Sequence, residues 1–245
     1  MITIKDLSIE NHKKKLITKL NVQFKKGEFW AILGKNGTGK TSLIHTMAGF
    51  LSYKNGSIKI NDQELKSLNI LSRAQNISLL PQMLEANLGC TVEQSISYGR
   101  YPWYKNSFDK EIEEQAINFA IEAMELDDLR NENIQQISGG ELRKVEIATI
   151  LAQNSEIMML DEPLNHLDLS FRYKLMELLK QLNTNKIIII VTHDIQYVQE
   201  YCSHVIMLLE DSHTIIGTSN DIMTKENLNK MLGTSLPNKF IKKTL

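Results

Sequence analysis

The sequence contains few cysteines and no excess of charge of either sign. Its 245 residues include two cysteines, Cys90 and Cys202, and the formal net charge is −1. The two cysteines lie far apart without a CxxC spacing, which argues against a structural zinc site or a disulfide framework and favours reduced thiols. The near-neutral charge gives no support to a nucleic-acid-binding protein, which usually carries a basic face. We therefore expect no nucleic-acid partner.

Long apolar runs are also missing. The longest uninterrupted run is IIIIV at Ile187 to Val191, which has the length of a strand and not of a membrane span. The N-terminal residues MITIKDLSIENHKKK contain no continuous apolar core of signal-peptide length. We therefore expect any work at a membrane to go through partner proteins.

Short apolar runs alternate with helical patterns along much of the chain. The runs at Gly27 to Gly34, Glu156 to Pro163 and Lys186 to Asp194 are bounded by polar breaks. Such runs are typical of central strands in a sheet that is covered on both faces. Because helical patterns lie between them, the sequence predicts an α/β core.

Two further parts are predicted beside this core. Residues 1–27 alternate between apolar and polar positions without an intervening helix, which indicates antiparallel strands. Residues 84–153 contain the amphipathic stretch FDKEIEEQAINFAIEAMELDDL and no strand signal, which indicates a helical insert. We predict one domain over residues 1–245, with the core and its antiparallel β subdomain at 1–83 and 154–245 and a helical subdomain at 84–153.

The stretch GKNGTGKT follows the first apolar run and precedes a helical pattern. It places Gly34, Gly39, Lys40 and Thr41 at the G-x-x-x-x-G-K-[ST] spacing. Backbone N–H groups of a glycine-rich turn can converge on phosphate oxygens, and the N-terminus of the helix adds unpaired donors and a positive dipole. Lys40 is expected to reach the β- and γ-phosphates and the Thr41 hydroxyl to bind Mg²⁺. The sequence therefore predicts a nucleotide site.

Two further polar groups follow the later apolar runs. Asp161 and Glu162 end the run IMMLD, where Asp161 could hold Mg²⁺ and Glu162 could polarise an attacking water. His193 follows IIIIVT, at the strand end where ligands bind in open α/β sheets. By position alone, an Asp-Glu pair is as typical of a loop cap, and a lone histidine is more often structural.

A double glycine stands at the start of a third helical pattern, in QISGGELRKVEI. Ser138 and Glu141 are spaced as a capping box, in which each side chain bonds the other residue's backbone N–H. That explanation leaves Gly139 and Gly140 unexplained, because glycine stabilises neither a cap nor a helix. The alternative is a second phosphate-binding surface. Since the chain already has one phosphate loop, this surface is expected to close over a nucleotide held by another copy, which gives a homodimer with two shared sites.

Taken in order, Gly34–Thr41, Gln82, Ser138–Glu141, Asp161–Glu162, Asp168 and His193 resemble the motifs of the ATP-binding-cassette ATPases. The resemblance covers nearly the whole chain and implies ATP hydrolysis with Mg²⁺. It also implies an α/β fold built as a P-loop NTPase core with an antiparallel β subdomain and an inserted helical subdomain.

The resemblance assigns a role to each matching residue. Glu162, His193 and Gln82 are the expected catalytic residues, as the base, the γ-phosphate switch and the Mg²⁺ sensor. Mg²⁺ would be held by Thr41, Gln82 and Asp161. Relatives usually stack adenine on an aromatic residue near the second strand, where this chain offers only His12. The full set expected to contact ATP is Gly34, Lys35, Asn36, Gly37, Thr38, Gly39, Lys40, Thr41, Ser42, Ser138, Gly139, Gly140, Glu141, Asp168 and His12.

The segment TVEQSISYGRYPW resembles, within this family, the importers of iron-siderophore, haem and cobalamin. The resemblance implies permease subunits that dock near Gln82–Trp103, an extracytoplasmic substrate-binding protein, and a location on the cytoplasmic face of the inner (plasma) membrane. The sequence leaves two roles equally open for Tyr101 and Trp103: packing in the core, or an exposed aromatic anchor at an interface. A soluble mechanical ATPase and a small-molecule P-loop kinase are the alternatives. Soluble mechanical ATPases usually carry a second cassette or a long coiled coil, and this sequence shows neither. A small-molecule kinase leaves Gly139 and Gly140 unexplained.

Overall fold

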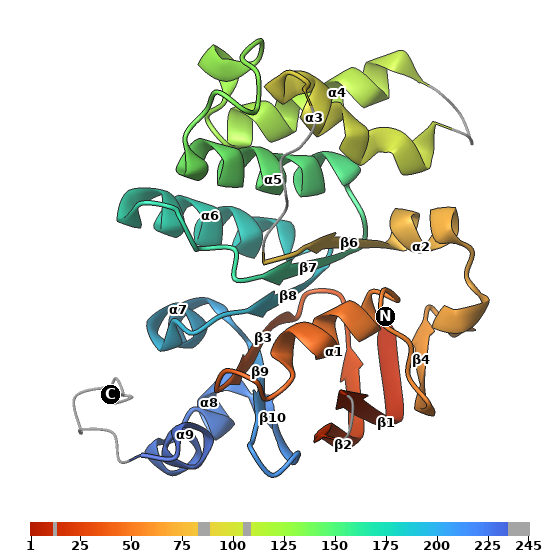
Figure 1. The fold of residues 1–245 in the computed structure, drawn as a ribbon, viewed down its shortest axis with the longest axis vertical. Helices are drawn as coiled ribbons and strands as arrows, with labels where there is room; N and C mark the ends of the chain where they lie inside the picture. Colours follow the sequence, from red (N-terminus) through yellow and green to blue (C-terminus); the bar gives the residue numbers. More distant parts are fainter. Residues whose placement is uncertain (12–13, 83–88, 105–108, 235–245) are drawn as a thin grey trace.

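The larger of two sheets forms the centre of the molecule. The structure is a computed structural model that describes residues 1–11, 14–82, 89–104 and 109–234. The sheet has the order β10-β9-β3-β8-β7-β6 and is parallel except for β10, which pairs antiparallel with β9. The three predicted strands β3, β7 and β8 lie side by side within it (Figure 1). Its strands are β3 (Phe29–Gly34), β6 (Ile77–Leu80), β7 (Ile157–Asp161), β8 (Ile187–Val191), β9 (His204–Leu208) and β10 (Thr214–Thr218).

Every residue of β3, β7 and β8 is buried, because the sheet is covered on both faces. Side chains alternate between the faces along a strand. Phe29, Ala31 and Leu33 accordingly belong to one hydrophobic core, and Trp30 and Ile32 to the other. The predicted α/β core is confirmed.

The antiparallel strands predicted near the N-terminus form a second sheet, of order β2-β1-β4-β5. Its apolar face packs against the large sheet and α1 (Lys40–Met47) in one shared core. The register pairs Asn11 with Lys14 and Glu10 with Lys15 across the two longest strands. The strands of this sheet are β1 (Ile2–Asn11), β2 (Lys14–Phe24), β4 (Asn55–Ile60) and β5 (Gln63–Glu64).

The other face of the large sheet is covered by helices (Figure 1). Helices α3 (Val92–Ser97), α4 (Lys110–Ala123) and α5 (Gly139–Gln153) form a group at the top of the view, as predicted for the insert. No helix in the described ranges is both long and apolar enough to cross a bilayer. The remaining helices are α2 (Ile70–Asn76), α6 (Leu169–Leu182), α7 (Ile195–Tyr201), α8 (Ser219–Ile222) and α9 (Lys225–Leu232), with 3₁₀ turns η1 (Leu65–Ser67), η2 (Tyr98–Trp103) and η3 (Asp127–Leu129).

The 3₁₀ turn η2 is held tightly against α5. A Cβ atom on Gly99 would lie 2.3 Å from the carbonyl oxygen of Thr149, so only glycine allows this approach. The buried Arg100 guanidinium donates to Glu113 on α4, with 2.9 Å from Nη2 to Oε1, and to the carbonyl oxygen of Ala152 at 2.8 Å. Because both charges are paired and bonded, their burial is tolerated. The GRYP segment is therefore fixed to the helical layer.

Candidate active site

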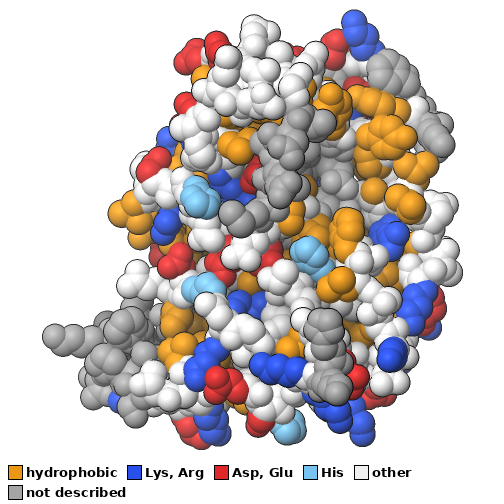
Figure 2. Space-filling model, viewed as in Figure 1, with side chains coloured by type: hydrophobic (Ala, Val, Ile, Leu, Met, Phe, Trp, Pro, Cys, Tyr) orange, Lys and Arg blue, Asp and Glu red, His pale blue; other side chains and the backbone are white. Residues whose placement is uncertain are grey.

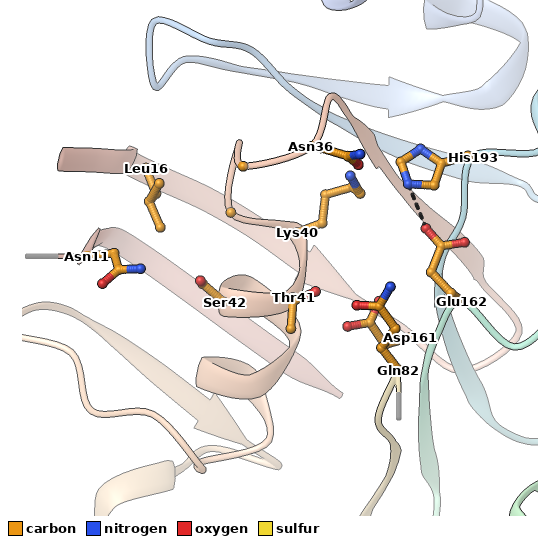
Figure 3. A pocket seen from close by; sticks show the side chains of 12 residues that line it. Asn11, Leu16, Asn36, Lys40, Thr41, Ser42, Gln82, Asp161, Glu162 and His193 are labelled. Carbon is orange, nitrogen blue, oxygen red and sulfur yellow. Dashed lines mark ion pairs between the residues drawn. The ribbon is translucent and has the colours of Figure 1, made fainter. Parts of the chain in front are cut away.

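A cavity of about 350 Å³ opens at the carboxyl ends of β3, β6, β7 and β8 (Figure 3). The predicted residues that line it are Asn36, Gly37, Gly39, Lys40, Thr41, Ser42, Gln82, Asp161, Glu162 and His193. Asn11 and Leu16, which the sequence does not predict, line its other end. Segments that lie far apart in the sequence thus meet at one edge of the sheet, as expected for the ligand crevice of an open α/β fold.

The phosphate loop connects β3 to α1 and depends on its glycines. Gly37 and Gly39 have φ angles of 77° and 104°, a left-handed conformation that glycine adopts without strain. A Cβ atom on Gly39 would also lie 2.9 Å from Cβ of Leu16. Glycine at position 39 therefore allows both the left-handed turn and the close approach of Leu16 where α1 begins. Gly34, Lys35 and Thr38 belong to the same loop and are not among the described residues that line the cavity.

The ammonium group of Lys40 is buried inside the loop. Its Nζ donates to the carbonyl oxygens of Gly34 at 2.8 Å and Lys35 at 3.1 Å. Burial lowers the pKa of Lys40, and the nearby carboxylates of Glu162 and Asp161 oppose that shift. These contacts hold a cation where the glycine-rich loop can meet an anionic group.

Asp161 provides a buried carboxylate at the end of β7. The residue is 1% exposed, and neither carboxylate oxygen has a hydrogen-bond partner within the described residues. A buried carboxylate without partners is costly unless a cation or donor meets it. Oxygen ligands of this kind suit Mg²⁺, which uses one or two carboxylates together with phosphate oxygens and water. The residues present therefore fit a Mg²⁺ ion.

Glu162 follows directly and lies in a conformation unusual for a residue with a side chain. Its φ is 50°, and its backbone N–H donates to the carbonyl oxygen of Val191 at 2.9 Å. Burial raises the pKa of Glu162 to about 7, against the lowering effect of Lys40. A carboxyl group with this pKa can accept a proton near neutral pH, as a general base must.

His193 contacts the same carboxyl group (Figure 3). Its Nε2 lies 2.9 Å from Oε1 of Glu162. Burial lowers the pKa of His193, with Lys40 acting in the same direction. Near neutral pH the contact therefore joins a largely uncharged imidazole to a carboxyl group that is partly protonated. The strand β8 positions both residues, because it holds the backbone of Glu162 and ends two residues before His193.

The raised pKa of Glu162 predicts a pH-dependent stability. Its folded pKa of about 7 lies above the ordinary value of 4.5, so the nucleotide-free chain is expected to lose free energy of unfolding as the pH rises between these values. The loss amounts to at most about 1.4 kcal/mol per pH unit. Urea titrations with a chelator present should show that Glu162→Gln removes this loss between pH 5 and 8.

The matched control for that titration is Glu156→Gln. The pKa of Glu156 is lowered, chiefly by the hydrogen bond from Lys26, so this carboxyl group titrates below the tested range. The control should therefore keep the wild-type pH slope. Equal slopes in wild type and Glu162→Gln would contradict the assigned effect of burial.

Ser138 forms the predicted capping box at the start of α5. Its N–H donates to Oε2 of Glu141 at 2.7 Å, and the N–H of Glu141 donates to its Oγ at 3.3 Å. A Cβ atom on Gly139 would meet no atom of the described residues within 4 Å, and one on Gly140 would lie 3.0 Å from the carbonyl oxygen of His166. Packing against other described segments therefore gives no reason for Gly139 to be a glycine, and its contact with another molecule stays a prediction.

The residues predicted to serve another copy's nucleotide lie apart from the cavity. Ser138, Gly139, Gly140, Glu141 and Asp168 are not among the described residues that line it. Asp168 instead caps α6, where its Oδ1 accepts from the N–H of Phe171 at 2.9 Å. Gln82 lines the cavity beyond β6, and His12 lies outside the described residues.

Arg143 is a structural link that sequence reasoning missed. It is 3% exposed, and its Nη2 donates to the carbonyl oxygens of Asp161 at 3.0 Å and Glu162 at 2.8 Å. Its Nη1 donates to Glu146 at 2.7 Å and to the carbonyl oxygen of Pro81 at 3.1 Å. Its position on the apolar face of α5, four residues before Ile147, is the signal that could have identified it.

The fold and the site together define a P-loop nucleotide hydrolase. The comparisons agree: residues 17–165 match the profile of the ABC transporter family. The petrobactin import ATP-binding protein YclP of Bacillus subtilis is 28% identical over 97% of this chain and 94% of that protein. The achromobactin transport ATP-binding protein CbrD of Dickeya dadantii is 34% identical over 84% of this chain and 77% of that protein.

Solved structures show the same fold. A metal-chelate type ABC transporter in an inward-facing conformation has a TM-score of 0.78 and 24% identity, over 95% of this chain and 88% of that one. The ATP-binding cassette MJ0796, dimeric and bound to ADP and Pi, has a TM-score of 0.78 and 24% identity, over 89% of this chain and 98% of that one. The chain belongs to the ABC transporter family, and it is an ATPase that binds ATP. The predicted family and fold class are confirmed.

Proposed function

We propose that this chain is the ATP-hydrolysing subunit of a membrane importer for a metal chelate. The convergence of Lys40, Asp161, Glu162 and His193 in one cavity supports ATP hydrolysis at this site. The import function is supported by the relatives named above for petrobactin import and achromobactin transport. Among the three predicted substrate classes, these names favour an iron-siderophore over haem or cobalamin.

The proposed roles follow from the geometry of the side chains. Lys40 binds the terminal phosphates, while Asp161 and Thr41 hold Mg²⁺, with Gln82 beside them. The ion, when bound, neutralises charge on the phosphates. Glu162 accepts the proton of the attacking water. His193, which touches Glu162, faces the side of the cavity assigned to the γ-phosphate.

We further propose that two copies enclose two ATP molecules. Ser138–Glu141 and Asp168 of each copy would face the nucleotide on the phosphate loop of the other. The uncovered Gly139 supports this arrangement, because an approaching phosphate meets backbone N–H groups there without a Cβ atom in the way. Residues 84–153 are the proposed helical subdomain of the single domain 1–245.

A second hollow in the surface is the proposed docking site for the permease. Its volume is about 360 Å³, and it lies between the end of α1, α2, η2 and α5. Figure 2 shows hydrophobic side chains gathered at the upper right, on the side of α2. The lining residues are Ala48, Phe50, Ile70, Arg73, Ala74, Ile77, Leu79, Tyr98, Gly99, Tyr101, Pro102, Thr149 and Gln153.

Large apolar residues remain exposed in this groove. Phe50 is 71% exposed, Tyr101 is 63% exposed, and Ile70 and Tyr98 are exposed as well. An exposed apolar groove of this kind fits the apolar face of a helix from a partner. Docking at this groove would place the chain on the cytoplasmic face of the plasma membrane, opposite an extracytoplasmic substrate-binding protein. Residues 83–88 of the predicted docking segment lie outside the described residues.

The structure separates the two aromatic residues of the GRYPW segment. Trp103 is half-buried, and its Nε1 donates to the carbonyl oxygen of Gln153 at 2.7 Å, so core packing describes it. Tyr101 lies on the same turn as an exposed side chain, which supports the anchor alternative for it. Tyr101 is therefore the residue at which docking can be tested without disturbing the fold.

We expect Tyr101→Ala to weaken assembly with the permease subunits about ten-fold or more while leaving hydrolysis by the isolated chain within two-fold of wild type. Truncating an exposed aromatic anchor removes interface area, and such residues are frequent hot spots. Co-purification with the permease and the ATPase rate measure the two effects. Phe119→Ala is the control, because Phe119 is an exposed aromatic on α4 outside the groove. Equal loss of assembly and of ATP hydrolysis in folded Tyr101→Ala would contradict the docking role.

The import function itself is tested in the cell. Disruption of the gene is expected to abolish uptake of an iron-labelled siderophore, and a wild-type copy should restore it, whereas a Glu162→Gln copy should not. Normal uptake of every siderophore, haem and cobalamin in the disrupted strain would favour the alternative of a mechanical ATPase that is not coupled to transport.

A further inference from the structure

Among the described residues, the end of the cavity that faces the nucleotide base offers few groups for stacking. Lys40, Asp161, Glu162 and His193 occupy one end, and Asn11 and Leu16 lie at the other (Figure 3). With the phosphates at Lys40, the base must extend toward β1 and β2. The sequence contains no Phe, Tyr or Trp before Phe24, whose side chain is fully buried.

Leu16 offers the base little apolar surface. It is 7% exposed, and its side chain packs against Gly39 at the start of α1. Stacking on an aromatic ring is worth about 1–3 kcal/mol per base, which is about 5- to 150-fold in affinity. A largely buried leucine cannot supply a face of that size, so among the described residues the groups around the phosphates have more to offer a nucleotide than those around its base.

Lys14 brings a second ammonium group to the phosphate loop. Its Nζ donates to the carbonyl oxygen of Gly37 at 3.2 Å, and Gly37 lines the cavity. Lys14 is the register partner of Asn11, and directly opposed residues of an antiparallel pair share one face of the sheet. Because Asn11 lines the cavity, Lys14 lies on the face of the sheet that borders the cavity.

Two lysines therefore hold one loop from different sides. Lys40 binds the carbonyl oxygens of Gly34 and Lys35 from inside, and the exposed Lys14 binds that of Gly37 from the rim. An ammonium group has three donors, and a single carbonyl oxygen uses one of them. A Cβ atom on Gly37 would meet no described atom within 4 Å apart from its chain neighbours, so Gly37 itself leaves room for a ligand at this rim.

We propose that Lys14 binds the phosphates of the nucleotide as a second cation and that the chain selects a nucleoside triphosphate through its phosphates, with little discrimination among bases. The proposal rests on the nucleotide site assigned above. It makes the start of β2, at Lys14, a phosphate-binding element.

The adjacent Lys15 provides a matched control. It carries the same charge and pairs with Glu10 across the strands. Because successive side chains of a strand point to opposite faces of the sheet, the Lys15 side chain faces away from the cavity. Its carbonyl oxygen accepts from Ser212 Oγ at 2.7 Å, a contact that a side-chain substitution leaves in place. A general effect of removing one positive charge would appear equally in Lys14→Ala and Lys15→Ala.

The test measures the Kd values of ATP, GTP and CTP with Mg²⁺ by calorimetry, together with kcat where turnover is detectable. The wild-type Kd values are expected to agree within about five-fold. Lys14→Ala should raise all three Kd values by about five-fold at low salt and lose its effect in high KCl, because exposed charges are screened. Lys15→Ala should match wild type.

Two results would overturn the proposal: a preference for ATP over CTP of more than fifty-fold, or equal Kd values for Lys14→Ala and wild type at low salt. A strong preference for ATP that His12→Ala removes would assign the base to His12. Failure of the nucleotide site itself would be distinct, because no nucleotide would then bind and Lys40→Ala would behave as wild type.

Discussion

The Glu162→Gln variant is expected to bind ATP but to hydrolyse it at least a hundred-fold more slowly than wild type. The amide keeps the size of the side chain and its place beside His193, but it cannot accept a proton from water. Loss of a general base costs about 10²- to 10⁴-fold in rate. Because ATP then persists between two copies, the variant should accumulate as a dimer, which light scattering coupled to size-exclusion chromatography measures.

A second substitution tests whether the dimer uses the surface assigned to it. Gly139→Leu should leave the fold intact, because a Cβ atom there meets no described atom within 4 Å. Added to Glu162→Gln, it should prevent the ATP-dependent dimer by covering the backbone N–H groups at the start of α5. Wild-type turnover in the single variant, or an undiminished dimer in the double variant, would contradict these roles.

Lys40→Ala is expected to lower the affinity for ATP at least a hundred-fold. The ammonium group is buried within the loop and supplies charge-assisted hydrogen bonds, each worth about 1.5–3 kcal/mol. The substitution also removes the bonds to Gly34 and Lys35 that hold the loop closed. Calorimetric titration with ATP measures the loss.

Lys35→Ala is the control for that experiment. Lys35 belongs to the same loop and is expected to contact ATP through its backbone, because its Nζ pairs with Glu210 at 3.1 Å, away from the cavity lining. The control should bind ATP within a few-fold of wild type. A thermal melt of both variants separates loss of binding from loss of fold. Tight ATP binding by folded Lys40→Ala would exclude the assigned contact with the phosphates.

Much of the fold follows from patterns within short stretches. The runs that became β3, β7 and β8 are apolar at every position because both faces of the sheet are covered, and that property is visible in the sequence. The phosphate loop and the Asp161–Glu162 pair could be placed at one sheet edge because parallel strands end there together. The capping box of Ser138 and Glu141 likewise follows from local spacing.

Other features depend on contacts between distant segments. Arg143 bonds backbone carbonyl groups, which carry no residue-specific signal in the sequence. Lys14 stands in a run of lysines that is indistinguishable from a solvated turn until the register with Asn11 is known. Tyr101 and Trp103 differ in exposure because a 3₁₀ turn presents them to different surroundings, and the sequence left both alternatives open.

The guanidinium of Arg143 joins two places that would serve different nucleotides. Arg143 lies on α5, which Ser138 caps, and it donates hydrogen bonds to the backbone carbonyl oxygens of Asp161 and Glu162. In a pair of protomers, a tilt of that helix caused by the ligand across the interface would shift the backbone that carries Asp161 and Glu162 in the same protomer. Occupancy of one nucleotide site would then bias the geometry of the other, with Arg143 as one of the links.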